Sequence, residues 1–234
     1  FDPYLLGYWL GDGASSHSGI TTQDSYVIKY LVDLFKTKHT NLYLQYKGSQ
    51  YDYRINAING YKNGNSFMRF LRKNNLLNNK HIPFNYKCNS RTIHLQLLAG
   101  IIDSDGYHKS NCYEIVQKNT QLATDIVFLC RSLGFACYTK KCKKTCTNAP
   151  NGPKTEEYNR ICVYGSGLEE IPVLCPRKKC TKRQQIKDAL VYRITVEKLE
   201  VDDYYGFEID GNRRFILGDF SVTHNTSISL YILS

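Results

Sequence analysis

The stretches "LLGYWLGDG" (Leu5–Gly13) and "LAGIIDSDG" (Leu98–Gly106) decide how this chain is expected to fold. Each is an apolar run that ends in an aspartate followed by a glycine. Each is also followed by a polar turn, a short strand-like segment and an amphipathic helix. A pattern that occurs twice in the same order predicts an α+β domain built from two similar halves related by a pseudo-twofold axis.

The helices that follow the two motifs are expected at residues 25–38 and 120–134, where apolar side chains recur with helical spacing. Asp24 and Asn119 stand directly before these helices. Both residue types have a short side chain that accepts hydrogen bonds from free backbone N–H groups at a helix start. We therefore predict that Asp24 and Asn119 are N-caps.

Small residues recur four positions apart within each motif, as Gly7 with Gly11 and as Gly100 with Ser104. Most of the other side chains are apolar on all sides, so each motif predicts a buried helix. Small residues at this spacing let two helix backbones approach closely. The two motif helices are therefore expected to pack against each other.

Asp12 and Asp105 end these two helices, and the glycines that follow, Gly13 and Gly106, are expected to be left-handed C-caps. A carboxylate at a helix C-terminus meets the negative end of the helix dipole, which costs roughly 0.3 to 1 kcal/mol, and two adjacent carboxylates repel each other. A divalent cation such as Mg²⁺ would compensate both effects. The sequence therefore predicts that Asp12 and Asp105 are metal ligands.

The composition favours a polyanionic partner. The 234 residues carry a formal net charge of +10 and include 19 tyrosines, which suit a wet, charged interface with nucleic acid. No apolar run reaches the roughly 18 residues that span a bilayer, and the first residues lack signal-peptide features. Nine cysteines, an odd number, favour reduced thiols. We expect an intracellular protein, cytoplasmic or nuclear, without a membrane partner.

The segment "KKCKKTCTNAPNGPK", residues 140–154, is rich in lysine and turn-forming residues and predicts an exposed loop. Such a loop is either only solvated or in contact with phosphates. Cys142, Cys146, Cys175 and Cys180 permit a zinc site, but their spacing falls short of the usual CxxC pairs. Zinc is therefore the weaker interpretation of these cysteines.

The two aspartate-ending motifs resemble the paired motifs of the LAGLIDADG (dodecapeptide, DOD-type) homing endonucleases, and the second is close to the family consensus. The resemblance covers residues 1–191. It implies an αββαββα pseudo-repeat whose sheets form a saddle over double-stranded DNA, in a monomer with an internal pseudo-dyad. It also implies that Asp12 and Asp105 bind divalent metal for staggered cleavage of both strands at one long target.

The same family has a basic residue near each active centre. The residues "NKHIPFNY", 79–86, match the element that precedes the second motif in the family, which makes Lys80 the first candidate. In the second half "CPRKKC", 175–180, offers Lys178 or Lys179, and the sequence does not choose between them. The alternative for each lysine is an exposed charge that only aids solubility.

From residue 192 onward, short alternating segments joined by turns predict a separate β-rich module, with a hairpin signal at Asp210-Gly211. The residues "YYGFEIDGNRRFILGDFSVTHN", 204–225, resemble the C-terminal splicing block of inteins. The resemblance implies that residues 192–225 are the C-terminal part of a Hint-type splicing domain. Inteins commonly carry a LAGLIDADG endonuclease within that domain, so the two resemblances support each other.

The tripeptide His224-Asn225-Thr226 has the groups that autocatalytic cleavage needs. An asparagine amide can attack its own backbone carbonyl, a histidine can assist the leaving amine, and a threonine hydroxyl can accept an acyl group. The resemblance implies that Asn225 ends the intein and Thr226 begins the C-terminal extein, residues 226–234. "TSISLYILS" fits a P-loop ATPase host and any other host helix equally well.

The splicing resemblance also implies a partner, because no counterpart of the N-terminal splicing block precedes Phe1 in this sequence. An N-terminal intein half is therefore expected. The leading hypothesis is an intein-borne, site-specific DNA endonuclease joined to C-terminal splicing residues. Two alternatives stay open: a catalytically inert LAGLIDADG protein that binds nucleic acid, and an intein fragment that only splices.

Overall fold

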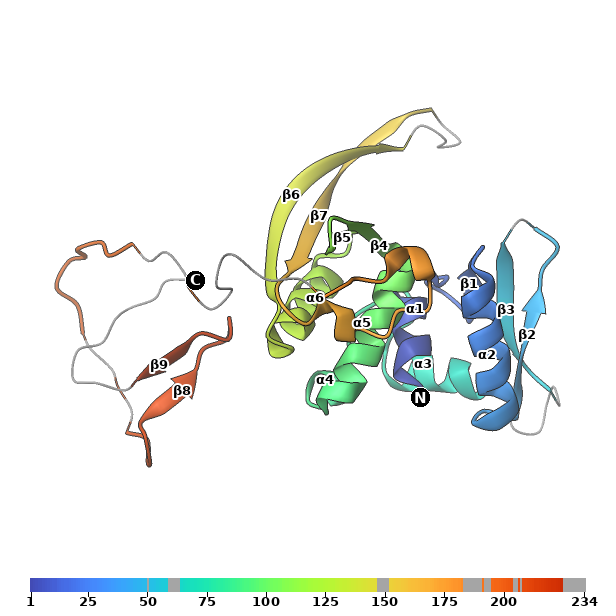
Figure 1. Ribbon diagram of the computed structural model, residues 1–234, viewed down its shortest axis with the longest axis horizontal. Coiled ribbons are helices and arrows are strands. Elements are labelled where there is room, and N and C mark those ends of the chain that lie inside the picture. Colours follow the sequence, from blue (N-terminus) through green and yellow to red (C-terminus); the bar gives the residue numbers. More distant parts are fainter. Residues whose placement is uncertain are drawn as a thin grey trace. The chain divides into compact units, whose positions relative to one another are not determined.

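The protein consists of two compact units, Phe1–Asp188 and Ala189–Ser234, as the computed structural model shows (Figure 1). The structure describes residues 1–49, 51–58, 64–146, 152–182, 191, 195–203, 206 and 208–224. Within these ranges no helix combines the length and apolar character needed to cross a membrane.

The first half of the larger unit folds around a small antiparallel sheet with the strand order β1-β3-β2. Its elements are, in chain order, α1 (Pro3–Asp12), β1 (Gly19–Thr21), α2 (Ser25–Thr37), β2 (Leu42–Tyr46), β3 (Asp52–Ala57) and α3 (Ser66–Lys73).

The second half forms an antiparallel sheet with the strand order β4-β5-β7-β6. Its elements are α4 (Phe84–Lys87), α5 (Arg91–Asp105), β4 (Gly106–Lys109), β5 (Cys112–Gln117), α6 (Thr120–Ser132), β6 (Ala136–Cys146), β7 (Lys154–Tyr164), and the 3-10 turns η1 (Leu168–Glu170) and η2 (Pro176–Lys178).

The two halves repeat one order of elements, because α1, β1, α2, β2 and β3 correspond to α5, β5, α6, β6 and β7. The counterpart of β4 in the first half is reduced to a single bridge between Gly13 and Ile20. Ile20 faces Tyr53 across its sheet as Ile115 faces Ile161 in the other sheet. The predicted α+β class is confirmed, and the larger unit has the predicted pseudo-repeat.

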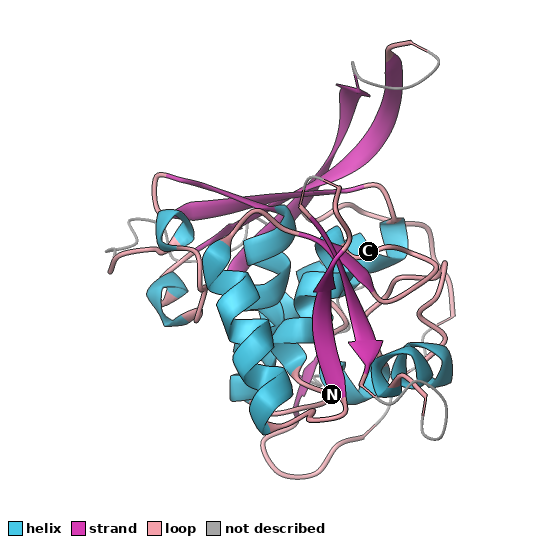
Figure 2. Cartoon of the chain, turned by 90° about the vertical axis from the view of Figure 1, so that its right-hand side faces the viewer, coloured by secondary structure: helices cyan, strands magenta, loops and turns pink. Residues whose placement is uncertain are grey.

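The centre of the larger unit is the contact between α1 and α5, which lie side by side in Figures 1 and 2. A Cβ atom added to Gly7 would lie 2.1 Å from the carbonyl oxygen of Leu97, and one added to Gly100 would lie 2.2 Å from that of Tyr4. No larger side chain fits at either position. The predicted close packing of the motif helices is therefore confirmed.

The prediction of left-handed caps at Gly13 and Gly106 is wrong, because both residues have extended backbones, with φ angles of −81° and −77°. Glycine is needed there for space. A Cβ atom on Gly13 would lie 2.2 Å from the carbonyl oxygen of Trp9, and one on Gly106 would lie 2.6 Å from that of Ile102. The chain thus leaves each motif helix directly in an extended direction.

The two predicted N-caps behave differently. The side chain of Asn119 accepts a hydrogen bond from the N–H group of Leu122 at 3.1 Å, so this prediction is confirmed. Asp24 occupies the N-cap position of α2 but makes no capping hydrogen bond with its side chain. Its carboxylate instead accepts two hydrogen bonds from the guanidinium group of Arg177.

The prediction of a loop at residues 140–154 is wrong for residues 140–146 and 154, because β6 and β7 pair over eleven residues each and project from their sheet as a long hairpin (Figure 1). Residues 147–151 lie outside the described residues. The turn-forming residues of this segment obscured the strand pairing at the level of the sequence. Lysines on β6 stand opposite glutamates on β7, as Lys143 does opposite Glu157 and Lys144 opposite Glu156. Such opposite-charge pairs favour the strand register.

The smaller unit contains a hairpin of β8 (Arg214–Ile216) and β9 (Val222–His224). Its turn is closed by a hydrogen bond from the N–H group of Phe220 to the carbonyl oxygen of Leu217 at 2.9 Å. The hairpin predicted at Asp210-Gly211 is wrong: Gly211 has a positive φ of 70° as in a turn, but the described residues before it form no strand. Residues 192–194 and 225–234 lie outside the described residues.

Candidate active site

The two motif aspartates meet where α1 and α5 end. A Cβ atom on Gly11 would lie 3.3 Å from the carboxyl carbon of Asp105, so this carboxylate lies against the neighbouring helix. Burial, and then the charge of Asp12, raise the pKa of Asp105 to about 6. Burial also raises the pKa of Asp12. The structure therefore brings the two predicted metal ligands into one electrostatic environment.

Lys80 lies at the C-terminal end of α1. Its ammonium group donates to the carbonyl oxygens of Gly11 at 3.0 Å and Gly13 at 2.7 Å, and it lies 5.1 Å from the ring centre of Trp9. Burial lowers the pKa of Lys80 to about 8, although the carboxylates of Asp105 and Asp12 oppose that shift. Lys80 thus occupies the position that the sequence predicted.

Lys178 holds the equivalent place at the end of α5. Its ammonium group donates to the carbonyl oxygens of Ile102 at 2.8 Å, Asp103 at 2.7 Å and Ser104 at 3.2 Å. Burial lowers its pKa. Lys179 is exposed, and within the described part of the chain its side chain has no hydrogen bond or ion pair. Of the two candidates, only Lys178 therefore lies in the site.

The two lysines change the expected electrostatics of the helix ends. The sequence argument assigned the compensation of the helix dipoles to a divalent cation. In the structure each helix C-terminus already receives an ammonium group, from Lys80 or from Lys178. The carboxylates of Asp12 and Asp105 therefore remain available for a further ligand.

Gln117 is a site residue that sequence reasoning missed. The side-chain amide of Gln117 donates a hydrogen bond to the carboxylate of Asp105. The backbone carbonyl oxygen of Gln117 accepts a hydrogen bond from the side chain of Asn159 at 3.2 Å. Aligning the two repeats on Ile20 and Ile115 places Thr22 at the equivalent position. That alignment would have indicated a polar residue on the buried face of both strands.

Thr22 does not repeat the role of Gln117, because its hydroxyl oxygen accepts from the N–H group of Asp24 at 3.2 Å. Among the described residues no hydrogen bond to the Asp12 carboxylate is present. One motif carboxylate is therefore oriented by an amide donor, whereas the other is not.

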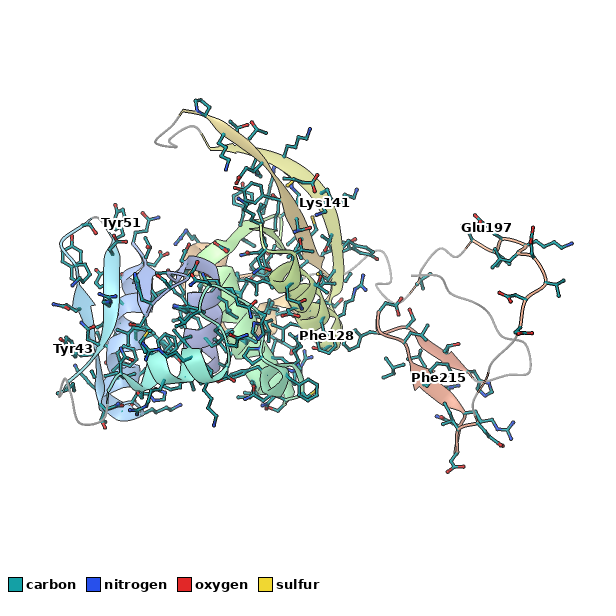
Figure 3. The ribbon with its side chains drawn as sticks, turned by 180° about the vertical axis from the view of Figure 1, so that it is seen from behind. Tyr43, Tyr51, Phe128, Lys141, Glu197 and Phe215 are labelled. Atoms are coloured by element: carbon teal, nitrogen blue, oxygen red, sulfur yellow. The ribbon has the colours of Figure 1, made fainter. Side chains whose placement is uncertain are left out.

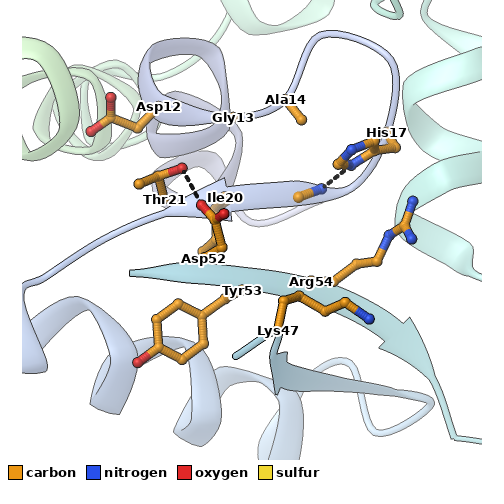
Figure 4. Close-up of a pocket in the computed structure, with 11 residues that line it drawn as sticks. Asp12, Gly13, Ala14, His17, Ile20, Thr21, Lys47, Asp52, Tyr53 and Arg54 are labelled. Carbon is orange, nitrogen blue, oxygen red and sulfur yellow. Dashed lines mark hydrogen bonds between the residues drawn. The ribbon is translucent and has the colours of Figure 1, made fainter. Parts of the chain in front are cut away.

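A pocket of about 420 Å³ lies beside Asp12 on the first sheet (Figure 4). Asp52 in this pocket is held by the hydroxyl groups of Thr21 at 3.1 Å and Ser49 at 2.5 Å. The residues that line the pocket are Asp12, Gly13, Ala14, His17, Gly19, Ile20, Thr21, Lys47, Asp52, Tyr53 and Arg54.

Basic groups border this pocket. His17 accepts a hydrogen bond from the N–H group of Gly19 at 2.9 Å, and burial together with the charge of Arg54 lowers its pKa. Within the described residues neither Lys47 nor Arg54 forms an ion pair. The pocket therefore places Lys47 and Arg54 beside two carboxylates, those of Asp12 and Asp52.

Several charges on the second sheet form ion pairs. Lys118 contacts Glu156 at 2.6 Å, and Arg160 contacts Glu114 at 3.3 Å. The long hairpin continues this pattern with Lys141 at 3.3 Å from Glu157; Figure 3 marks Lys141 on the hairpin. Exposed aromatic side chains lie on both halves: Figure 3 marks Tyr43 and Tyr51 on the first, and Phe84 and Tyr107 are exposed on the second.

The described residues contain no group of three or more His, Cys, Asp or Glu side chains that could hold a metal ion. This finding gives no support to a zinc site among Cys142, Cys175 and Cys180; the side chain of Cys146 is not described. A cation bound by Asp12 and Asp105 would take its remaining ligands from water and substrate. Carboxylate oxygens are the donors that Mg²⁺ prefers, so the two residues fit this ion.

The predicted splicing residues lie in the smaller unit. His224 ends β9, is exposed, and stands opposite Arg214 in the hairpin register. Asn225 and Thr226 lie outside the described residues. The geometry of this tripeptide is therefore known only for His224.

Paired carboxylates with two lysines at a helix–helix interface define a class of site suited to cleaving phosphodiesters. Residues 81–192 match the family model described as homing endonuclease. The resemblance to the homing endonucleases that the motifs predicted is therefore confirmed over these residues.

The chain is also similar to a protein named replicative DNA helicase DnaB from Mycobacterium intracellulare. The two are 34% identical over 138 residues, which cover 58% of this chain and 20% of the helicase. The chain thus corresponds to about a fifth of the length of this relative.

Among solved structures, the chain is similar to that of I-DmoI in complex with DNA and Ca, with a TM-score of 0.41 and 14% identity over 70% of this chain and 82% of that one. It is also similar to I-DmoI in complex with DNA and Mn, with a TM-score of 0.41 and 15% identity over 70% of this chain and 88% of that one.

Proposed function

We propose that this protein is a site-specific endonuclease that hydrolyses both strands of double-stranded DNA at one target, leaving staggered ends. The observation that carries the proposal is the convergence of Asp12 and Asp105 beside Lys80 and Lys178 at the ends of two touching helices. The match of residues 81–192 to the homing endonuclease family supports it.

Asp12 and Asp105 would hold Mg²⁺ or a similar divalent cation. When bound, such an ion lowers the pKa of a water molecule and stabilises negative charge on phosphate. The raised pKa values of both aspartates mean that the bare carboxylates are poorly solvated. A positive ligand between them would therefore favour their ionised forms.

Lys80 and Lys178 would act on the phosphate. Each ammonium group is fixed by carbonyl oxygens, so it is positioned before substrate arrives. With a pKa of about 8, Lys80 stays mostly protonated at neutral pH. It can therefore stabilise developing charge or donate a proton from Nζ to the departing oxygen.

Double-stranded DNA is the partner that the charge distribution favours. The chain carries a net charge of +10, and the pocket beside Asp12 presents Lys47 and Arg54 without ion-pair partners in the described residues. Neutralising phosphates with such groups releases counterions, which supplies much of the affinity for DNA. The internal repeat provides two half-sites in one chain, so we propose that it acts as a monomer.

Incubation with Mg²⁺ and a randomised double-stranded DNA library, followed by sequencing of the cut ends, tests this function. We expect one long recognised sequence, cut on both strands at offset positions, and no cutting in EDTA. Binding without cutting would support the alternative of an inert nucleic-acid-binding protein. Cutting that ignores sequence would overturn the assignment of a site-specific enzyme.

We propose a second function for the smaller unit, in which residues 192–225 would be the C-terminal part of an intein splicing domain. The order His224-Asn225-Thr226 supports Asn225 cyclisation with acyl transfer to Thr226 at the start of the extein, residues 226–234. The similarity to a fifth of a replicative DNA helicase supports an element carried within a longer host protein. A host of the P-loop ATPase type would fit the residues "TSISLYILS".

Mass spectrometry after adding an N-terminal intein half tests the splicing proposal. We expect the upstream segment to become joined to Thr226, and expect Asn225→Ala to block release of the intact extein. If the wild-type chain joins the segments but cuts no DNA in Mg²⁺, the alternative of a splicing-only fragment holds. The described cysteines are free thiols, which supports an intracellular, reducing compartment.

A further inference from the structure

The segment that carries Lys178 is fastened to a buried carboxylate. Asp103, only 2% exposed, accepts hydrogen bonds from the N–H groups of Leu174 at 2.6 Å and Cys175 at 3.3 Å. It also accepts from the Tyr4 hydroxyl at 2.8 Å. These two backbone contacts lie three and four residues before Lys178, so they fix where η2 begins.

The segment that carries Lys80 is fastened in the same way to a different carboxylate. Asp125 on α6, 1% exposed, accepts from the N–H group of Ile82 at 2.8 Å, two residues beyond the lysine. It also contacts the ammonium group of Lys87 at 2.5 Å and the side-chain amide of Gln121 at 2.9 Å. Each lysine segment therefore has one buried carboxylate of its own.

These carboxylates are not part of the repeated pattern. The first motif has Leu10 where the second has Asp103, and both residues are buried in the same helix–helix core. The helix contact itself therefore does not require a carboxylate. Burying a carboxylate costs free energy unless hydrogen bonds and charges satisfy it. The contacts made by Asp103 and Asp125 therefore have to offset the desolvation of these two carboxylates.

We propose that Asp103 and Asp125 are positioning residues, Asp103 for Lys178 and Asp125 for Lys80, and that each sets the activity of one lysine only. The proposal rests on the proposed endonuclease function. The physical reason is the length of a lysine side chain, which loses much rotamer entropy when fixed. Its ammonium group reaches the helix carbonyls only while the backbone that carries it is held in place.

The variants Asp103→Asn and Asp125→Asn test this directly. Asparagine keeps the shape of the side chain but replaces one accepting oxygen with an NH₂ group. In Asp103→Asn that group faces the N–H group of Leu174 or of Cys175. In Asp125→Asn it faces the N–H group of Ile82 or the donors of Lys87 and Gln121. At least one contact of the original carboxylate is therefore lost in each variant. Tyr4→Phe is the matched control for Asp103, because it removes one hydrogen bond to the carboxylate and leaves both backbone contacts.

The first measurement needs no catalysis. Surface lysines are acetylated with acetic anhydride in the folded full chain, and modification is read by mass spectrometry. We expect Asp103→Asn to raise the acetylation rate of Lys178 about tenfold, with Lys80 unchanged, and Asp125→Asn to do the reverse. Tyr4→Phe should change neither. An equal rise in the acetylation rates of Lys80 and Lys178 in either variant would overturn the proposal.

The second measurement uses a double-stranded DNA that the wild-type chain cuts, with a different 5′ label on each strand, in Mg²⁺. Asp103→Asn should slow the cleavage of one strand about tenfold and Asp125→Asn that of the other, without a change in DNA affinity. A purely structural role would slow both strands together, and that result would refute the positioning role. If the wild type cuts no DNA, the proposed endonuclease function fails. The acetylation rates then still show whether Asp103 holds Lys178 in place and Asp125 holds Lys80 in place.

Discussion

The two active centres share a skeleton and differ in their polar contacts. In both, an aspartate ends a buried helix and a lysine ammonium binds that helix's last carbonyls. Among the described residues only Asp105 receives an amide hydrogen bond, from Gln117, whereas Asp12 borders the pocket that Lys47 and Arg54 also line. The repeat thus supplies the charges, and contacts outside the repeated pattern supply their orientation.

This difference predicts that the two active centres act at different rates. A carboxylate held by an amide donor is oriented before substrate binds, whereas one without such a donor depends on the substrate or a cation for its orientation. We therefore expect the two DNA strands to be cut at different rates. The changes below test what the two centres share and where they differ.

The largest effect is expected from removing a shared carboxylate. Asp12→Asn or Asp105→Asn should each slow cleavage of both strands by about 10³-fold, because the two groups act as one cation site. Single-turnover cleavage of strand-labelled DNA measures this. A variant that still nicks one strand at the wild-type rate would show instead that each carboxylate serves its own strand.

The next effect separates two neighbouring lysines. Lys178→Met should slow one strand about 10²-fold, since the ammonium group at the end of α5 is lost. Lys179→Met is the matched control, because it removes an equal charge from an exposed side chain one residue away. Its single-turnover rate should stay within about twofold of wild type. Similar losses in both variants would reassign the effect to DNA affinity.

A third change concerns stability without metal. The pKa of Asp105 is about 6 in the folded state against about 3.9 in an unfolded chain, so the folded state binds the proton more tightly. Stability present below pH 4 is therefore lost as the pH rises through 6. At pH 7.5 in EDTA, Asp105→Asn should raise the free energy of unfolding by about 3 kcal/mol.

Denaturant titration of both proteins at pH 7.5 and pH 4 checks this expectation. The difference between them should shrink at pH 4, where the wild-type carboxyl group is protonated in the folded state. An equal difference at both pH values would mean that repulsion and burial of the Asp105 charge are not its cause.

The smallest effect tests the asymmetry itself. Gln117→Ala should slow one strand about tenfold, because Asp105 loses its orienting donor, and should bring the two strand rates closer together. Thr22→Ala at the equivalent position of the first half should leave the ratio of the two rates unchanged. Strand-resolved nicking in Mg²⁺ measures both, and a changed ratio in Thr22→Ala would contradict the assigned asymmetry.

The spacing of small residues and the repeated Asp-Gly were sufficient to predict the helix contact and the meeting of Asp12 with Asp105. These features act within one element or between identical elements, so periodicity records them. The position of Lys80 followed from a family motif. The choice between Lys178 and Lys179 depended on the 3-10 turn η2, whose direction no local pattern fixes.

Features with distant partners could not be predicted. Asp24 was expected to cap its helix, but its partner Arg177 lies 153 residues further along the chain. The long β6–β7 hairpin was hidden because turn-forming residues near its tip outweighed the alternation of lysine with glutamate across two strands. Gln117 was overlooked because its importance lies only in its hydrogen bond to Asp105.

The glycine contacts between α1 and α5 also limit how such a protein can be rebuilt. Because Gly7 and Gly100 each face a backbone carbonyl of the other helix, both halves must carry a glycine at the crossing point. A hybrid that joins the first half of one protein to the second half of another can therefore exchange its strands, hairpin and pocket freely. It keeps two correctly spaced aspartates only if both crossing glycines are retained.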